Sequence, residues 1–353
     1  MIKILKAVLF ATGLFISVHY MTGVLRVRSQ ETLSDSYYAL ADDGCDVLFV
    51  GNSLIMNAVY PMQLYEEYGI TGYNLGSGGQ SLMESRALIE EGIARFHPRL
   101  IVLDTTQLIV REPVQKIAFL HYLTDNMPAF SRFRFGMILD FVRIMKYSPD
   151  EAMGLLVPIT LYHSEWEGMQ SLIPAADPKR YTAGAKVTAK VLTDVKVHEK
   201  HEADENAVFG ELAVNTLRDI LEMCRNSGTD ICLISIPLQS VSQEGYIRRT
   251  DAAYFAKRLA DEYGINMFNC IDRAEEMGFD ISHDSTDGFH MNVFGSERYT
   301  TALGYFLREN YSLPDRRTDG SHTFMQDMEE EWRKEKERRI LATAAGAAGA
   351  DAQ

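Results

Sequence analysis

The sequence predicts an α/β fold in which helices flank a parallel sheet, with a helical insertion and an N-terminal transmembrane helix. Short apolar runs alternate with helical patterns from residue 45 to residue 125, and the same alternation returns after residue 206. Strand–helix–strand order requires crossover connections, which make neighbouring strands parallel and place helices on both faces of the sheet. We therefore expect a parallel sheet sandwiched between two layers of helices.

The individual elements follow from apolar periodicity and from the glycines and prolines that end them. The expected strands cover residues 46–50, 72–75, 100–103, 231–236 and 266–269. The expected helices cover residues 62–68, 81–96, 207–224, 251–263 and 294–309. Gly69, Pro98, Gly228 and Pro237 stand at or just beyond the ends of four of these elements.

Residues 126–205 interrupt this alternation and are expected to form an insertion. The segment is rich in Met, Phe and Tyr up to about Tyr162, and it is polar and basic near residues 179–200. Two interpretations are equally compatible with that composition. The insertion either caps or lines a substrate site, or it forms a packed helical subdomain that makes no functional contact.

The N-terminus predicts a membrane anchor within residues 1–28. Lys3 and Lys6 precede an apolar stretch over residues 7–25, and Arg26 and Arg28 follow it. Nineteen helical residues span roughly 28 Å, close to the thickness of a bilayer core. We expect a single-pass protein of the cell membrane whose folded domain lies outside the cytoplasm. A cleaved signal peptide and a soluble amphipathic start are the alternatives.

The segments on either side of the sheet domain are polar. Residues 29–44 are expected to form a juxtamembrane spacer, and residues 313–353 a charged helix followed by a low-complexity tail. The charge-dense stretch over residues 327–339 is interpreted as a solvated helix face.

Composition excludes several classes of function. The chain has 353 residues, 46% of them hydrophobic, and a formal net charge of -14, so nucleic acid is not an expected partner. The four cysteines have no metal-binding spacing, although Cys224 and Cys232 could pair. No glycine-rich nucleotide-binding motif is present. No cofactor and no metal are therefore expected.

Three motifs carry the candidate chemistry. Residues 47–53, VLFVGNS, form an apolar run that ends in a Gly-x-Ser turn, where a serine nucleophile is expected. Residues 74–80, NLGSGGQ, form a glycine-containing turn. Asp287 precedes His290 by three residues, so its carboxylate can hold one imidazole nitrogen and leave the other free to activate a hydroxyl group.

Together these motifs resemble the SGNH hydrolases, also called the GDSL esterase/lipase superfamily, over residues 45–312 without the insertion. The resemblance implies Ser53 as nucleophile, His290 as base and Asp287 as its orienting acid. It implies a flavodoxin-like three-layer sandwich. It also implies an oxyanion hole formed by the N–H groups of Ser53 and Gly79, with the side-chain amide of Gln107 as the third donor. Two positions depart from the family pattern. Asn52 replaces the usual Asp, and Gln107 stands where a Gly-x-Asn-Asp motif would supply an Asn donor.

The resemblance and the anchor together imply a serine esterase that removes small acyl groups from an acylated polysaccharide or a related small ester of the cell envelope. An O-acyltransferase with the same triad, working beside a membrane-bound acyltransferase, is the first alternative. A non-catalytic glycan-binding protein on a degenerate SGNH fold is the second, and the missing Asn favours it. A metal site formed by His283, Asp284, Asp287 and His290 is a further alternative to the triad.

Overall fold

The structure is a computed structural model with a parallel sheet at its centre. It describes residues 1–26, 28–40, 44–109, 117–168, 171–196, 198–199, 201–237, 242–271, 273–318, 320 and 323–350. The sheet has five strands in the order β2-β1-β3-β4-β5, and every neighbouring pair is parallel. The strands are β1 (Val47–Val50), β2 (Gly72–Asn74), β3 (Leu100–Asp104), β4 (Asp230–Ser235) and β5 (Met267–Asn269). This order is the flavodoxin-like one, so the predicted α/β class is confirmed.

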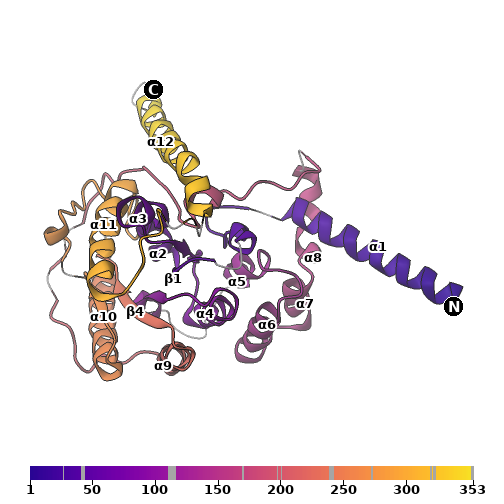
Figure 1. The fold of residues 1–353 in the computed structure, drawn as a ribbon, viewed down its shortest axis with the longest axis horizontal. Coiled ribbons are helices and arrows are strands. Elements are labelled where there is room, and N and C mark those ends of the chain that lie inside the picture. The colour runs from indigo at the N-terminus through magenta and orange to yellow at the C-terminus, as the bar shows by residue number, and fades with distance from the viewer. Residues whose placement is uncertain are drawn as a thin grey trace.

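Helices cover both faces of the sheet (Figure 1). The helices of the sheet domain are α2 (Ser53–Ala58), α3 (Pro61–Tyr68), α4 (Leu82–Phe96), α9 (Glu211–Ser227), α10 (Gln243–Tyr263) and α11 (Val293–Asn310). Alternate residues of each strand point to opposite faces, which explains why the strands read as continuous apolar runs. Leu48 and Val50 pack with α4, α9 and α10, whereas Val47 and Phe49 pack with α2, α3 and α11.

The helices of the insertion lie beside the sheet domain (Figure 1). Helix α5 (Ile117–Thr124) precedes the insertion. The helices of the insertion are α6 (Arg132–Met145), α7 (Pro149–Leu156) and α8 (Ile159–Tyr162). Short 3₁₀ turns η3 (His163–Gly168) and η4 (Arg180–Thr182) follow. The other 3₁₀ turns are η1 (Asp35–Ala39), η2 (Thr105–Ile109) and η5 (Glu275–Met277).

The two ends of the chain form long helices. Helix α1 (Ile2–Leu25) projects away from the domain, and its 24 residues are long and apolar enough to cross a membrane or to act as a signal sequence. Helix α12 (Phe324–Ala350) contains the predicted charged stretch. That stretch was expected to be a solvated face. This was wrong for Trp332, which is fully buried against Tyr60.

All four cysteines are buried free thiols. Cys224 and Cys232 therefore do not pair. They belong to different packed layers, because Cys224 lies in the core under α9 and Cys232 lies on the opposite face of the sheet.

Candidate active site

Ser53 is the first residue of α2, directly beyond the carboxyl end of β1. Asn52 precedes it and caps the helix, because its side-chain oxygen accepts the N–H of Leu54 at 2.8 Å. The N–H of Ser53 occupies the first helical position, where a helix supplies no partner of its own. Asn52 therefore has a structural role, as the N-cap of α2, that does not depend on catalysis.

Gly51 makes the sharp turn between β1 and α2 possible. A Cβ atom at this position would lie 2.8 Å from Cβ of Asp104 and 3.0 Å from Cγ2 of Ile55. Such contacts are too close for any side chain. The glycine lets β1 and β3 bring the nucleophile turn against the end of the neighbouring strand.

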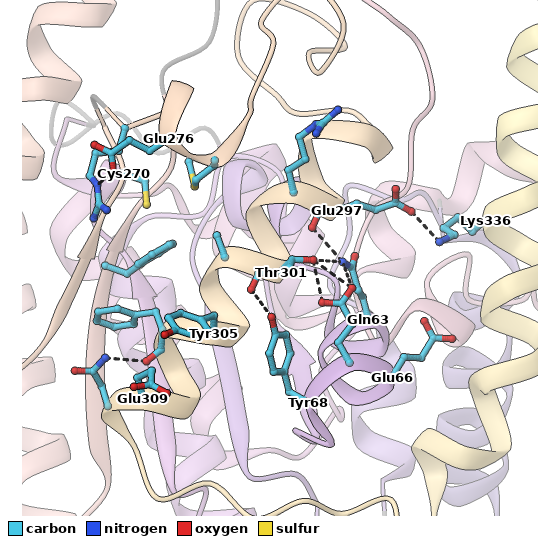
Figure 2. Close-up of a pocket in the computed structure, with 18 residues that line it drawn as sticks. Gln63, Glu66, Tyr68, Cys270, Glu276, Glu297, Thr301, Tyr305, Glu309 and Lys336 are labelled. Atoms are coloured by element: carbon cyan, nitrogen blue, oxygen red, sulfur yellow. Dashed lines mark hydrogen bonds and ion pairs between the residues drawn. The ribbon is translucent and has the colours of Figure 1, made fainter.

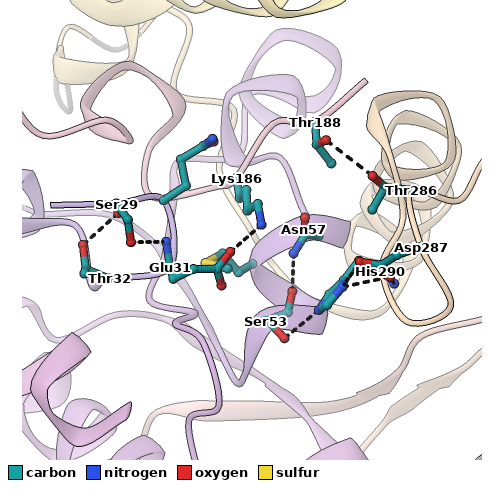
Figure 3. Close-up of polar contacts among 12 residues, drawn as sticks. Ser29, Glu31, Thr32, Ser53, Asn57, Lys186, Thr188, Thr286, Asp287 and His290 are labelled. Carbon is teal, nitrogen blue, oxygen red and sulfur yellow. Dashed lines mark hydrogen bonds and ion pairs between the residues drawn. The ribbon is translucent and has the colours of Figure 1, made fainter. Parts of the chain in front are cut away.

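The structure brings Ser53, His290 and Asp287 into one chain of contacts (Figure 3). The Ser53 Oγ atom lies 2.8 Å from Nε2 of His290. Nδ1 of His290 lies 3.1 Å and 3.0 Å from the two carboxylate oxygens of Asp287. These are hydrogen-bonding distances, and they connect residues 237 positions apart in the sequence.

The ionisation of Asp287 fixes how this chain is protonated. Partial burial opposes the charge of Asp287, but the His290 hydrogen bond and charge, with the N–H groups of Phe289 and His290, outweigh it and lower its pKa to about 2. An ionised carboxylate only accepts hydrogen bonds. In the neutral imidazole the proton therefore sits on Nδ1, and Nε2 is left to accept the Ser53 hydroxyl proton.

A closed loop holds His290 in place. Ser285 and Met291 form an antiparallel bridge, and the Thr286 N–H donates to the His290 carbonyl oxygen at 3.0 Å. Asn292 caps α11 with its side-chain oxygen, while its Nδ2 donates to the carbonyl of His283 at 2.6 Å. The Met-Asn that follows His290 in the sequence therefore fastens the loop to the helix.

The turn over residues 74–80 packs directly on α2. Nδ2 of Asn74 donates to the carbonyl oxygens of Ile55 at 2.9 Å and Val59 at 3.0 Å, and its Oδ1 accepts the Gly76 N–H at 2.9 Å. Gly79 has φ +67°, which an L-residue rarely adopts. A Cβ there would also lie 2.4 Å from the Phe119 ring. The proposed donation from the Gly79 N–H to an oxyanion stays a prediction.

Comparisons with known proteins find only distant similarity. No protein-family model and no curated sequence matches the chain. A Bacteroides fragilis crystal structure, named for a proposed acylhydrolase activity, is similar with 10% identity and TM-score 0.36, covering 76% of this chain and 89% of that one. A GDSL-like lipase from Bacteroides thetaiotaomicron is similar with 9% identity and TM-score 0.39, covering 78% and 95%. Proteins this distant can differ in activity, so only the geometry of the site bears on function.

That geometry places the serine after the first strand of a 2-1-3-4-5 sheet and the Asp-x-x-His pair just before α11. The chain has the predicted α/β fold, a parallel sheet flanked by helices.

Gln107, the predicted third oxyanion donor, is hydrogen-bonded to Gln80 and Ser85. Its Nε2 donates to the Gln80 carbonyl oxygen at 2.9 Å and to Ser85 Oγ at 2.8 Å, and its Oε1 accepts from Ser85 at 3.1 Å. A side-chain amide has two donor hydrogens, and both are used here. Gln107 instead joins β3 to the turn over residues 74–80. Its longer side chain reaches interior partners instead of the site edge.

The insertion contributes one segment that the SGNH resemblance did not foresee. Residues 179–192, here called the strap, run past all three motifs. Two strap carbonyl oxygens accept backbone N–H groups: Ala183 accepts from Asn74 at 2.9 Å, and Thr188 accepts from Val293 at 2.7 Å. The Lys186 N–H donates to the Met56 carbonyl oxygen at 2.8 Å. This part of the insertion therefore contacts the elements that carry the candidate site.

Two strap lysines face the site elements from inside. The Lys179 side chain is fully buried, and its Nζ lies 3.2 Å from the Gly76 carbonyl oxygen and 3.5 Å from Sδ of Met56. Burial lowers the pKa of Lys179 to about 8, although Asp177 and Glu31 oppose this shift. Lys186 forms an ion pair with Glu31 of the N-terminal spacer (Figure 3). Sequence offered only the basic character of this segment as a signal.

A buried Arg249 lies behind the triad. Its Cζ lies 5.6 Å from the centroid of the Phe289 ring, between Asp287 and His290 in the sequence. Burial lowers the pKa of Arg249 to about 10, while Asp104 and Asp287 oppose the shift. Phe289 itself is 54% exposed, so its outer face stands open beside His290. Sequence reasoning missed this arginine because α10 starts eight residues earlier than expected.

A separate hollow of about 1010 Å³ lies against α3 and α11 (Figure 2). Gln63, Glu297 and Thr301 are hydrogen-bonded to one another there, and Lys336 of α12 pairs with Glu297 at 2.8 Å. None of the residues that line it belongs to the triad.

The alternative metal site finds no support in the structure. His283 pairs with Asp284 at 2.8 Å, whereas Asp287 pairs with His290. Among the described residues no three His, Cys, Asp or Glu side chains gather as a metal-binding group.

Proposed function

We propose that this protein is a membrane-anchored serine esterase that removes small acyl groups from a cell-envelope glycan or a related ester. The observation that carries the proposal is the continuous contact from Ser53 Oγ to His290 and on to Asp287, with an ionised carboxylate at its end. A binding module has no chemical need for this arrangement, which argues against the non-catalytic alternative.

The chemistry follows from the protonation of the triad. Nε2 of His290 takes the proton from the Ser53 hydroxyl as Oγ attacks the ester carbonyl carbon. The imidazolium then gives this proton to the departing alcohol oxygen, and the carbon–oxygen bond breaks to leave an acyl group on Ser53. Water repeats the sequence with His290 as base and releases a carboxylic acid. The N–H groups of Ser53 and Gly79 are the proposed donors to the oxyanion.

The openness of the site supports a polymeric substrate. The Asp287 carboxylate is half exposed, and the Phe289 ring presents its outer face to solvent next to His290. An ester carried on a long chain can reach an open edge without entering an enclosed cavity. An exposed aromatic face also offers an apolar surface on which a sugar ring can pack.

A decisive test compares the full-length protein in detergent with its Ser53→Ala variant. We expect the intact protein to react with a fluorophosphonate probe and to release acetate from a chromogenic acetyl ester. Ser53→Ala should lose labelling and at least about 10³-fold in rate. Ser282→Ala, which alters an exposed serine that donates to Asp280, is the matched control and should keep both. Absence of labelling in a folded protein, or turnover independent of Ser53, would contradict the proposal.

The same open edge admits an alcohol as readily as water, which keeps acyl transfer as the second candidate. Soluble glycan oligosaccharides added to the reaction separate the two. A new ester on the oligosaccharide, detected by mass spectrometry and lost in Ser53→Ala, identifies a transferase. Acetate alone identifies an esterase.

A further inference from the structure

The insertion exposes a group of large apolar side chains on the side that faces α1. They come from the segment before α6, from α8, from η3 and from the loop after it. The members are Phe130, Leu161, Trp166, Leu172 and Ile173, which are between 47% and 76% exposed. Single exposed apolar residues are ordinary on protein surfaces, but these belong to segments that all contact the apolar helix α1. We call these five residues the apolar platform.

The platform is continuous with α1. The rings of Phe15 and Phe130 lie 5.2 Å apart, and the Tyr20 hydroxyl donates to the Leu172 carbonyl oxygen at 2.7 Å. Helix α1 also packs against α8 and η3, which carry Leu161 and Trp166. Figure 1 shows α8 alongside the domain end of α1. A medium that surrounds α1, such as lipid, therefore also contacts the platform.

The position of Phe15 along α1 sets the depth of this contact. Phe15 precedes the last residue of α1 by ten positions, which corresponds to about 15 Å along the helix axis. The whole helix of 24 residues is about 36 Å long, against a bilayer core of about 30 Å. If α1 spans the bilayer, Phe130 cannot remain wholly in water, because its ring contacts a residue well inside α1.

The composition of the region fits a lipid neighbour. Between residues 126 and 173 there are four basic and five acidic residues, so the segment is nearly neutral despite the net charge of -14 for the chain. A hollow of about 1070 Å³ between α1 and the insertion is lined both by aromatic rings and by charged side chains, among them Phe15, Phe130, Arg26, Asp125 and Arg134. Trp166 is an exposed tryptophan of the kind enriched where membrane meets water.

We propose that the apolar platform inserts into the headgroup and upper acyl region of the bilayer that α1 spans, with lipid as its direct partner. This inference rests on the membrane anchoring proposed for α1. Attachment through both α1 and the platform would fix the orientation of the folded domain relative to the membrane. Attraction to the bilayer is apolar rather than electrostatic, so it should persist in zwitterionic lipid and at high salt.

The test uses the full-length protein in phosphatidylcholine nanodiscs prepared with plain or brominated lipid, because bromine quenches tryptophan at short range. The chain has only two tryptophans, Trp166 and Trp332. Trp332 is fully buried and serves as an internal reference. The Trp166→Phe variant retains Trp332 as its single tryptophan. Phe10→Trp in the Trp166→Phe background places a reporter on the exposed surface of α1.

We expect brominated lipid to quench the wild-type protein and the Phe10→Trp reporter, and to leave the Trp166→Phe protein unquenched. The loss of tryptophan fluorescence in the wild-type protein should be the same in low and high salt. Quenching of Phe10→Trp without quenching of Trp166 would overturn the platform and leave the anchor standing. That result would point to a protein partner on this surface. Failure to quench Phe10→Trp would instead overturn the anchor, and the platform with it.

Discussion

Asp104 is a buried carboxylate at the end of β3, directly behind the serine turn. It accepts hydrogen bonds from the N–H of Thr106 at 3.1 Å and from the Thr106 hydroxyl, and it packs against Gly51. Burial raises the pKa of Asp104 to about 6, although the Thr106 bonds and the charge of Arg249 oppose the shift. Asp287 shows the opposite behaviour, because its hydrogen bonds keep its pKa near 2.

These two shifts affect stability in opposite pH windows. Asp104 ionises near pH 4 in the unfolded chain and near pH 6 in the folded protein, so the folded state holds the extra proton between them. The stability that Asp104 contributes therefore falls as pH rises from about 4 to 6. The contribution of Asp287 is fully present above about pH 4 and is lost as pH falls towards 2.

Replacing Asp104 with the isosteric asparagine should remove the first of these effects. Asp104→Asn keeps an oxygen that can accept from Thr106 but carries no titrating group. We expect its midpoint of thermal unfolding to drop less between pH 4 and pH 7 than that of the unmodified protein, by a few degrees. Scanning calorimetry at the two pH values measures this difference. Asp140→Asn, at an exposed position of α6, should follow the unmodified protein. Equal pH dependence in both variants would contradict the role given to Asp104.

At the scale of elements, the strap makes the catalytic arrangement depend on the insertion. The Lys179 amine donates to the Gly76 carbonyl of the glycine turn and contacts Met56 of α2, so it joins that turn to the helix that begins at Ser53. The strap backbone meanwhile bonds Asn74, Met56 and Val293. The distances within the triad are therefore set in part by a segment from outside the sheet.

Lys179→Met tests this dependence. The methionine fills similar space but leaves the Gly76 carbonyl without its donor, which costs about 1–3 kcal/mol of stability. If the turn shifts away from α2, kcat for the chromogenic ester falls while KM changes little. Steady-state kinetics and chemical denaturation measure the two effects. Lys190→Met, at an exposed strap position, should change neither. Loss of stability with unchanged kcat would show that Lys179 supports the fold without positioning the site.

The sequence was informative about the parts of the site that short local motifs determine. Ser53, Asp287 and His290 sit where strand ends and the Asp-x-x-His spacing place them, and the structure brings them together. Gln107 could not be placed, because the direction of its side chain depends on Ser85 and Gln80 in another element. The strap alternates apolar and polar residues over 185–190, but this period-2 pattern does not say which distant elements it contacts. It is fixed by backbone hydrogen bonds to distant residues.

The sheet was predictable for a different physical reason. Strands buried on both faces read as continuous apolar runs, and glycines such as Gly69 and Gly228, with positive φ, end the helices between them. Strand order could not be derived, since β2 lies beside β1 rather than beside β3. The charged pattern of α12 also concealed one aromatic residue that belongs to the core.

At the scale of the whole molecule, both ends of the chain brace the strap. Gln30 of the N-terminal spacer accepts the Val187 N–H at 3.3 Å, and Glu31 pairs with Lys186. Arg339 of α12 reaches the Val187 carbonyl oxygen at 3.5 Å from the other side. The N-terminal spacer and the tail helix therefore both contact the strap, although they are far apart in the sequence.

Trp332 fastens α12 to this arrangement, so its removal should affect the whole molecule. Its indole ring packs edge-on against Tyr60 with centroids 5.3 Å apart, and it is fully buried. Trp332→Ala should lower the free energy of unfolding by about 3–5 kcal/mol, since truncation of a buried aromatic leaves a cavity.

Trp332→Phe separates ring packing from polar contacts. The indole N–H finds no hydrogen-bond acceptor among the described residues, so phenylalanine should lose much less than alanine. Lys334 lies on the exposed side of α12, where it pairs with Glu330 and Glu331. Lys334→Ala should therefore change the free energy of unfolding little. Denaturant unfolding measures all three variants. Limited proteolysis should then cleave the strap faster in Trp332→Ala, because α12 no longer holds Arg339 against it. An unchanged cleavage rate at the strap would show that the tail stabilises the fold without bracing the site.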